Sequence, residues 1–234
     1  MVETTVWYVL GTVAMAAGTG YALWGFVVDQ RRHWRYYAVL AAVTGIATVA
    51  YLMMSLGIGS IRIQGALLYV PRYVDWLLTT PLLLLYLAML ARPSRGTYWV
   101  LIGLEIFVIA AGVLASGLPS LLGWLVYGLG LFAYLGILYV VTAVLPRQAA
   151  LDAHRPAAVF TKLRNLTVVL WSIYPIVWAL GPFGLGMLLV ETEAIVVTYL
   201  DVLAKVGFVV IAVNGRDAFE YITPTADAGT AGGV

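Results

Sequence analysis

The sequence predicts an all-α integral membrane protein, a bundle of seven transmembrane helices. Of its 234 residues, 63% are hydrophobic and only 10% are charged, and the mean hydropathy is +0.97. A soluble domain has roughly a quarter of its residues charged, so this chain is too apolar to be one. Polar or glycine- and proline-rich breaks divide the chain into seven apolar segments. Each is long enough to cross a bilayer core of about 30 Å, which takes about 20 helical residues.

Each predicted span is an apolar run between two such breaks. The first span lacks a basic start and is too long for the apolar part of a signal peptide, so we expect it to be retained. The second connection, GIGSIRIQGAL, has room for a hairpin, whereas the fourth, SGLPS, is very short and favours antiparallel neighbours. The predicted spans are 4–28, 36–59, 68–91, 97–117, 120–145, 158–180 and 190–213.

The basic residues predict the orientation, because lysine and arginine stay on the cytoplasmic side of a membrane. Ten of the thirteen lie in or beside the first, third and fifth connections or after the last span, and Arg62 alone lies on the other side. The N-terminus is therefore expected outside and the C-terminus in the cytoplasm. We expect 1–216 to form one membrane domain and 217–234, which ends in TPTADAGTAGGV, to be a disordered tail.

Several classes of function are disfavoured by what the chain contains. It has no cysteine, and His33 and His154 both lie among loop charges, so neither a disulfide nor a metal site is expected. The spans show no internal repeat of the kind that many transporters carry. Membrane lipid is the expected environment, with no nucleic-acid partner.

Five ionisable residues fall inside the predicted spans, where each costs several kcal/mol and is a functional hypothesis by default. Arg72, Asp75 and Thr79 are spaced i, i+3, i+7 and so share one helical stripe, while Asp201 and Lys205 are four residues apart. A structural ion pair on one helix would explain the second pattern. A cluster of two negative and two positive charges, with a protonated cation held above two carboxylates, explains both. The five residues are Arg72, Asp75, Glu105, Asp201 and Lys205.

A lysine buried in an apolar environment can also act as a nucleophile toward aldehydes and form a Schiff base. Trp171, Tyr174 and Trp178 are spaced i, i+3, i+7 on one face of the sixth span, where Pro175 can kink the helix, and Trp76 adds a ring from the third span. An aromatic stripe can be ordinary packing. Beside a buried lysine, it indicates a slot for a long, flat, apolar ligand.

The chain resembles the haloarchaeal microbial rhodopsins over all seven spans, on the motifs RYVDWLLTTPLLL, LRNLTVVLWSIYPIVW and YLDVLAKVGF. The resemblance implies all-trans retinal carried as a protonated Schiff base on Lys205, with Asp75 as primary counterion and proton acceptor and Asp201 as second counterion. Light would isomerise retinal to 13-cis and the Schiff base proton would pass to Asp75. Arg72 resembles the arginine that orders water below the carboxylates, and Tyr51 the tyrosine that hydrogen-bonds them.

The resemblance also assigns the remaining wall of the retinal pocket. Thr79 and Thr80 match threonines near the Schiff base and in the hydrogen bonds of the third span. The other implied pocket residues are Trp76, Val108, Gly112, Gly130, Tyr134, Trp171, Tyr174 and Trp178.

One position separates a pump from a sensor within this family. Outward proton pumps carry a carboxylic acid eleven residues after the primary acceptor, and here that residue is Tyr86. A tyrosine, whose ordinary pKa is about 10, is a poor internal proton donor, so reprotonation is expected to be slow. A slow cycle suits a signalling state. Val108 and Gly130 also resemble sensory rhodopsin II, and Tyr199 lies where that group meets a two-helix transducer.

Other positions depart from sensory rhodopsin II. Ala204, directly before the lysine, is typical of pumps, whereas the sensors have a threonine there that bonds the pocket tyrosine. Glu105 stands where pumps have aspartate and the sensors often asparagine, and we expect it to be protonated and hydrogen-bonded within the bundle. Glu193 matches a glutamate of the pumps' proton-release group, but its partner position is Phe183. This mixture resembles the middle rhodopsins.

The sequence therefore favours a photoreceptor that is not an enzyme and that signals to a membrane transducer through a slow photocycle. The alternative is a slow light-driven outward proton pump, which Asp75, Arg72 and Glu193 permit. Asp75 argues against a chloride pump, which has a small hydroxyl residue there. A seven-helix receptor or enzyme without retinal is disfavoured by Lys205. A homo-oligomer is compatible with the sequence.

Overall fold

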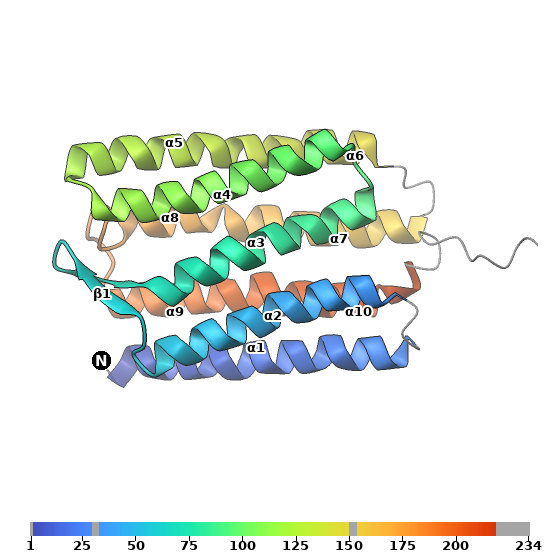
Figure 1. Ribbon diagram of the computed structural model, residues 1–234, viewed down its shortest axis with the longest axis horizontal. Helices are drawn as coiled ribbons and strands as arrows, with labels where there is room; N and C mark the ends of the chain where they lie inside the picture. The colour runs from blue at the N-terminus through green and yellow to red at the C-terminus, as the bar shows by residue number, and fades with distance from the viewer. Residues whose placement is uncertain (1, 30–32, 150–153, 219–234) are drawn as a thin grey trace, which may run out of the picture.

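The computed structural model describes residues 2–29, 33–149 and 154–218, and seven of its helical spans are long and apolar enough to cross a membrane. They run side by side along the long axis of the molecule (Figure 1). The predicted fold class is confirmed, whereas the tail from 219 onward lies outside the described residues. The first four spans are α1 (Val2–Val28), α2 (Trp34–Ser55), α3 (Val70–Ala91) and α4 (Arg95–Gly117).

The last three spans are each interrupted. The fifth is α5 (Ser120–Tyr139), a π-helical turn η1 (Val140–Val144) and α6 (Leu145–Gln148). The sixth is α7 (His154–Trp171) and α8 (Ile173–Leu180), and the seventh is α9 (Val190–Val202), a π-helical turn η2 (Leu203–Gly207) and α10 (Phe208–Asn214), followed by η3 (Arg216–Ala218). The described chain begins and ends at opposite ends of the bundle (Figure 1). Which end faces the cytoplasm stays a prediction from the basic residues.

The second connection forms the hairpin that its length allows. Strands β1 (Ser60–Ile63) and β2 (Ala66–Tyr69) pair antiparallel, with Ser60 opposite Tyr69 and Ile63 opposite Ala66. The two turn residues, Gln64 and Gly65, have φ of 52° and 83°, as a tight hairpin turn with the right twist requires. The second span therefore ends at Ser55, earlier than the expected residue 59.

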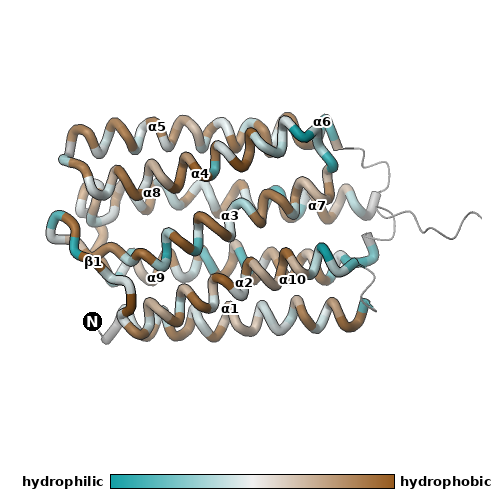
Figure 2. The backbone as a smooth tube through the Cα atoms, viewed as in Figure 1, coloured by the Kyte–Doolittle hydropathy of each residue, from teal (hydrophilic) through white to brown (hydrophobic). Residues whose placement is uncertain are grey.

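Hydrophobic residues occur along the whole length of the helices, and most hydrophilic residues lie toward the two ends of the bundle (Figure 2). Large hydrophobic side chains face outward, including Phe132, Trp99 and Val27, which are 76%, 67% and 65% exposed. Such a surface would be unstable in water and fits the hydrocarbon of a bilayer. The protein is therefore a multi-pass membrane protein, and the ionisable side chains in the middle of its spans are buried inside the bundle.

Small residues let α1 approach the second and seventh spans closely. A side-chain carbon at Gly25 would lie 2.7 Å from Val213 and 2.8 Å from Tyr37, closer than real contacts allow. Small residues at helix contacts are typical of membrane bundles, because the attraction there comes from close packing of the backbones.

Candidate functional site

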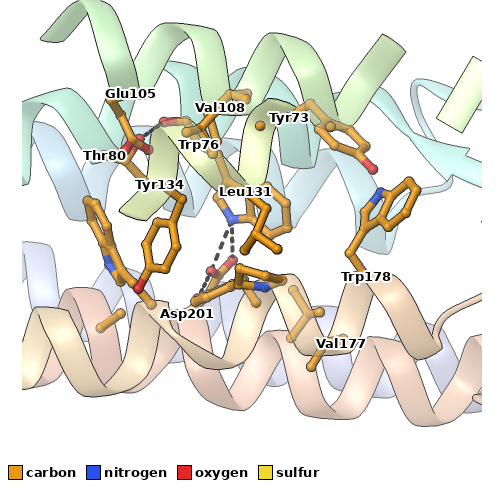
Figure 3. A pocket seen from close by; sticks show the side chains of 18 of the residues that line it. Tyr73, Trp76, Thr80, Glu105, Val108, Leu131, Tyr134, Val177, Trp178 and Asp201 are labelled. Carbon is orange, nitrogen blue, oxygen red and sulfur yellow. Dashed lines mark hydrogen bonds between the residues drawn. The ribbon is translucent and has the colours of Figure 1, made fainter. Parts of the chain in front are cut away.

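A cavity lies inside the bundle between α3, α4, α5, α8 and the seventh span. Aromatic and aliphatic side chains form most of its wall, and a few polar groups lie among them (Figure 3). The cavity is therefore a slot for a mainly apolar molecule.

Lys205 lines this cavity. It lies within the π-helical turn η2, which interrupts the seventh span. Such turns inside helices are frequent at functional sites. Lys205 is 1% exposed, and its Nζ donates a short hydrogen bond to Asp75 Oδ2 and lies 3.6 Å from Asp201 Oδ2. An ammonium group this deep in a low-dielectric interior must be paired, and two carboxylates pair it.

Asp201 joins four parts of the bundle through its two oxygens. Tyr51 of α2 donates to Oδ2 at 2.8 Å, and Tyr174 of α8 donates to Oδ1 at 2.6 Å. The indole Nε1 of Trp76 on α3 donates to both oxygens at 3.0 and 3.2 Å (Figure 3). Asp201 therefore accepts hydrogen bonds through both of its oxygens, from groups on three other spans.

Asp75 is held differently from Asp201. It is 0% exposed, its Oδ2 accepts from Lys205, and no described group bonds its Oδ1. Thr79, one turn later, donates its hydroxyl to the backbone carbonyl of Asp75 at 2.8 Å. Asp75 therefore keeps one carboxylate oxygen with spare capacity directly beside the lysine.

Arg72 is held by residues of the first and seventh spans. Its Nη1 donates to Glu193 Oε1 at 3.2 Å and its Nη2 to the hydroxyl of Tyr8 at 3.1 Å. The guanidinium also lies over the rings of Tyr8 and Tyr69, at 5.9 and 5.6 Å. A glutamate of the seventh span and a tyrosine of α1 therefore bind the nitrogens of Arg72. The role that the resemblance implies for Arg72, ordering water below the carboxylates, stays a prediction. Nothing in the local sequence pattern indicated Tyr8.

Glu105 lies in the wall of the cavity and is 3% exposed. The Thr80 hydroxyl, which lines the same cavity, donates to the Trp76 carbonyl at 2.6 Å. That Glu105 is protonated and hydrogen-bonded within the bundle stays a prediction from the sequence.

Because position 204 is an alanine, the pocket tyrosine, Tyr174, has no hydroxyl partner there. Ala204 is buried and lines the cavity, and it offers no hydroxyl to Tyr174. The Tyr174 hydroxyl instead bonds Asp201. The relay that a threonine at 204 would allow is absent for this reason.

The structure brings most of the sequence-predicted site residues to the cavity. Four of the remaining ones lie next to residues of the cavity wall. Tyr86 lies apart in the packed core and is 0% exposed. Its ring centroid is 5.8 Å from that of Tyr36 and 5.3 Å from that of Phe208. The predicted residues that line the cavity are Trp76, Thr80, Val108, Gly112, Gly130, Tyr134, Trp171, Tyr174, Trp178, Glu193, Asp201 and Lys205. The four predicted residues that adjoin the cavity wall are Tyr51, Arg72, Asp75 and Thr79.

The wall also contains residues that were not predicted from the sequence. Tyr73 lies three residues before Trp76 and Tyr127 seven before Tyr134, so helical spacing could have placed both on the same faces as their partners. Ile109 and Leu131 carry no such signal, since aliphatic residues occur on every face of these helices.

The fold and the site define a seven-helix membrane protein with a buried lysine, paired to two aspartates, beside an aromatic slot. A family model described as bacteriorhodopsin-like protein matches residues 2–219, and the chain belongs to this family. It is 45% identical over 224 residues to sensory rhodopsin-2 of Halobacterium salinarum, covering 96% of this chain and 93% of that protein. It is 40% identical over 234 residues to sensory rhodopsin-2 of Haloarcula vallismortis, covering 99% and 98%.

A solved structure shows the same architecture. The thermophilic rhodopsin from Rubrobacter xylanophilus superposes with a TM-score of 0.88 at 34% identity, over 94% of this chain and 98% of that one. The rhodopsin family implies a retinal chromophore on a lysine. The residues present fit that group, because the chain has two lysines and only Lys205 reaches the cavity, while Lys162 is exposed on α7. These findings support a retinal photoreceptor.

Proposed function

We propose that the protein is a sensory rhodopsin II-like or middle rhodopsin-like photoreceptor, which signals to a membrane transducer through a slow photocycle. Retinal, held by Lys205 through a Schiff base, would supply the absorption of light and the isomerisation from all-trans to 13-cis. The aromatic wall formed by Trp76, Trp171, Tyr174 and Trp178 would hold the polyene and exclude water.

The two aspartates differ in their fitness to accept a proton from the Lys205 nitrogen. Asp75 Oδ2 is in direct contact with that nitrogen, and its other oxygen is free of described partners. Asp201 receives hydrogen bonds from three neutral donors, which stabilise its charge. The proton would therefore move to Asp75, and Asp201 would stay ionised.

Transfer of this proton would change the forces across the bundle. The attraction between Asp75 and the lysine nitrogen would vanish, because both partners would become neutral. Arg72 and Glu193 would keep their own pair, since neither depends on Asp75 for a hydrogen bond. The third and seventh spans, which this attraction connects, would be freer to separate, and such a shift would be the signal.

Tyr86 is the observation that carries the choice of a sensor over a pump. Its hydroxyl is buried in the core beside Tyr36 and Phe208, with no described hydrogen-bond partner. A phenol in that environment does not release a proton readily, so the lysine nitrogen would regain its proton from water and slowly. Tyr199, 64% exposed on α9, offers a surface for a transducer helix.

The experiment is a light-induced pH measurement on cells that express the protein with retinal, with and without a protonophore. The photocycle decay is recorded alongside, with and without azide, a small proton carrier. We expect no sustained acidification and a slow decay that azide accelerates. Steady acidification that the protonophore abolishes, together with a fast decay, would instead establish the proton pump.

A further inference from the structure

The two halves of the sixth span are held to the bundle in different ways. In α8, Tyr174 donates to Asp201 of α9 at 2.6 Å and Trp178 Nε1 to Ser116 of α4 at 3.3 Å. In the described part of α7, the side-chain hydrogen bonds that the structure shows stay within the helix, such as the bond of Thr167 to the Leu163 carbonyl at 3.0 Å. The half beside the cavity is anchored, and the other half is held mainly by packing.

The boundary between the two halves is a weak point of the helix. α7 ends at Trp171, α8 begins at Ile173, and Ser172 lies between them. Pro175 has no backbone N–H, so it cannot bond the Trp171 carbonyl. The Ser172 hydroxyl donates back to the Val168 carbonyl at 2.7 Å, a contact that often bends helices.

Two tyrosines of α5 hold α8 and the residue at this boundary. Because the Ser172 hydroxyl uses its proton on Val168, the Tyr134 hydroxyl must be the donor in its 2.9 Å bond to Ser172 Oγ. Tyr127, seven residues earlier on the same face of α5, donates to the Pro175 carbonyl at 2.9 Å. Its ring also stacks on Trp178, with centroids 4.6 Å apart and planes at 10°.

We propose that Tyr127 and Tyr134 are positioning residues, a two-point clasp that fixes α8 to α5 and places the bend of the sixth span at Ser172. With the clasp closed, α8 keeps its place in the cavity wall while α7 can tilt about Ser172. With the clasp removed, α8 would follow α7, and water would reach the lysine nitrogen sooner. The last step rests on the proposed photocycle, whereas the anchoring of α8 does not.

The anchoring is tested without light or retinal, by hydrogen exchange on the full chain in lipid nanodiscs. We compare the double variant Tyr127→Phe and Tyr134→Phe with Tyr139→Phe, which removes a hydroxyl from an exposed tyrosine at the end of the same helix. The backbone amides of 173–180 should exchange about fivefold faster for each lost hydrogen bond, and those of 160–170 much less. Equal exchange in the double variant and the Tyr139→Phe control would overturn the proposal.

A double-mutant cycle tests the bond between Tyr134 and Ser172. Ser172→Ala should reproduce the exchange of Tyr134→Phe, and the combined variant should add little to either change. Fully additive effects would show that the two groups act separately, against the clasp.

The positioning role is tested in the retinal-loaded protein by the lifetime of the long-lived photoproduct. The double variant should shorten this lifetime about five- to 25-fold relative to Tyr139→Phe, which is the effect of losing one or two hydrogen bonds. Faster exchange with an unchanged lifetime would reduce the clasp to a structural contact and overturn the positioning role. If the protein proved to be a pump, the exchange result would stand, so failure of the proposed function and failure of the clasp are distinguishable.

Discussion

Replacing Asp201 by asparagine tests whether this carboxylate is the ionised centre of the site. The side chain is 1% exposed and accepts from Tyr51, Tyr174 and Trp76, on three different spans, at 2.6 to 3.2 Å. Asparagine keeps the shape but removes the charge, and its amide nitrogen replaces one acceptor oxygen. Each hydrogen bond then changes from a charged to a neutral one.

The expected loss of stability follows from that change. A hydrogen bond to a charged group contributes about 1.5–3 kcal/mol and a neutral one about 0.5–1.5, so each of the three bonds loses about 1 kcal/mol. The free energy of unfolding should fall by about 3 kcal/mol. For a chain of this size, that corresponds to about 6–12 °C in the midpoint of thermal denaturation.

The assay is thermal denaturation of the purified protein without retinal, so that the chromophore does not contribute. Tyr51→Phe removes one of the three bonds and should cost about 1 kcal/mol. Glu191→Gln removes the same charge from the same helix near its start and should leave the midpoint almost unchanged. If Asp201→Asn unfolds at the same temperature as Glu191→Gln, Asp201 is not an ionised hydrogen-bonding centre and our argument about proton transfer fails.

Four further predictions follow from the site and the packing. Lys205→Ala should abolish covalent retinal, measured by the visible absorption band after retinal is added; a stable covalent pigment would show that another group binds it. Asp75→Asn should shift the absorption to the red, because a negative charge beside the nitrogen is removed, and an unchanged spectrum would reject Asp75 as counterion. Tyr86→Asp should accelerate the photocycle decay at least tenfold, on the order expected of general acid catalysis, and make added azide ineffective, whereas a decay as slow as in the parent protein would show that Tyr86 is not the cause. Gly25→Ala should lower the unfolding free energy by about 1–3 kcal/mol through overpacking against Val213. Gly20→Ala, with no atom near the added carbon, should not, and equal stabilities would contradict the close approach of α1.

The sequence by itself determined the fold class and the chemistry of the site. Seven runs of about 20 apolar residues have the length of membrane-crossing helices, in which every backbone hydrogen bond is made within the segment. A lysine and carboxylates inside such runs cannot remain unpaired, so their mutual pairing also followed from the sequence. The spacing of Trp171, Tyr174 and Trp178 placed them on one face, and all three line the cavity.

Only the tertiary structure decided which groups meet across helices. Periodicity fixes the direction of a side chain on its own helix, but the rotation and depth of neighbouring helices determine its partner. Arg72 meets Tyr8 and Glu193, residues far away in the sequence, and a charge count alone could not distinguish them from the two aspartates.

The hydrogen bonds that cross between spans follow the same rule. The three donors to Asp201 and the bond from α5 to Ser172 depend on distances that must be correct to a few tenths of an ångström. Local sequence determines what each helix offers, and the packing of the bundle determines which of these groups come close enough to bond.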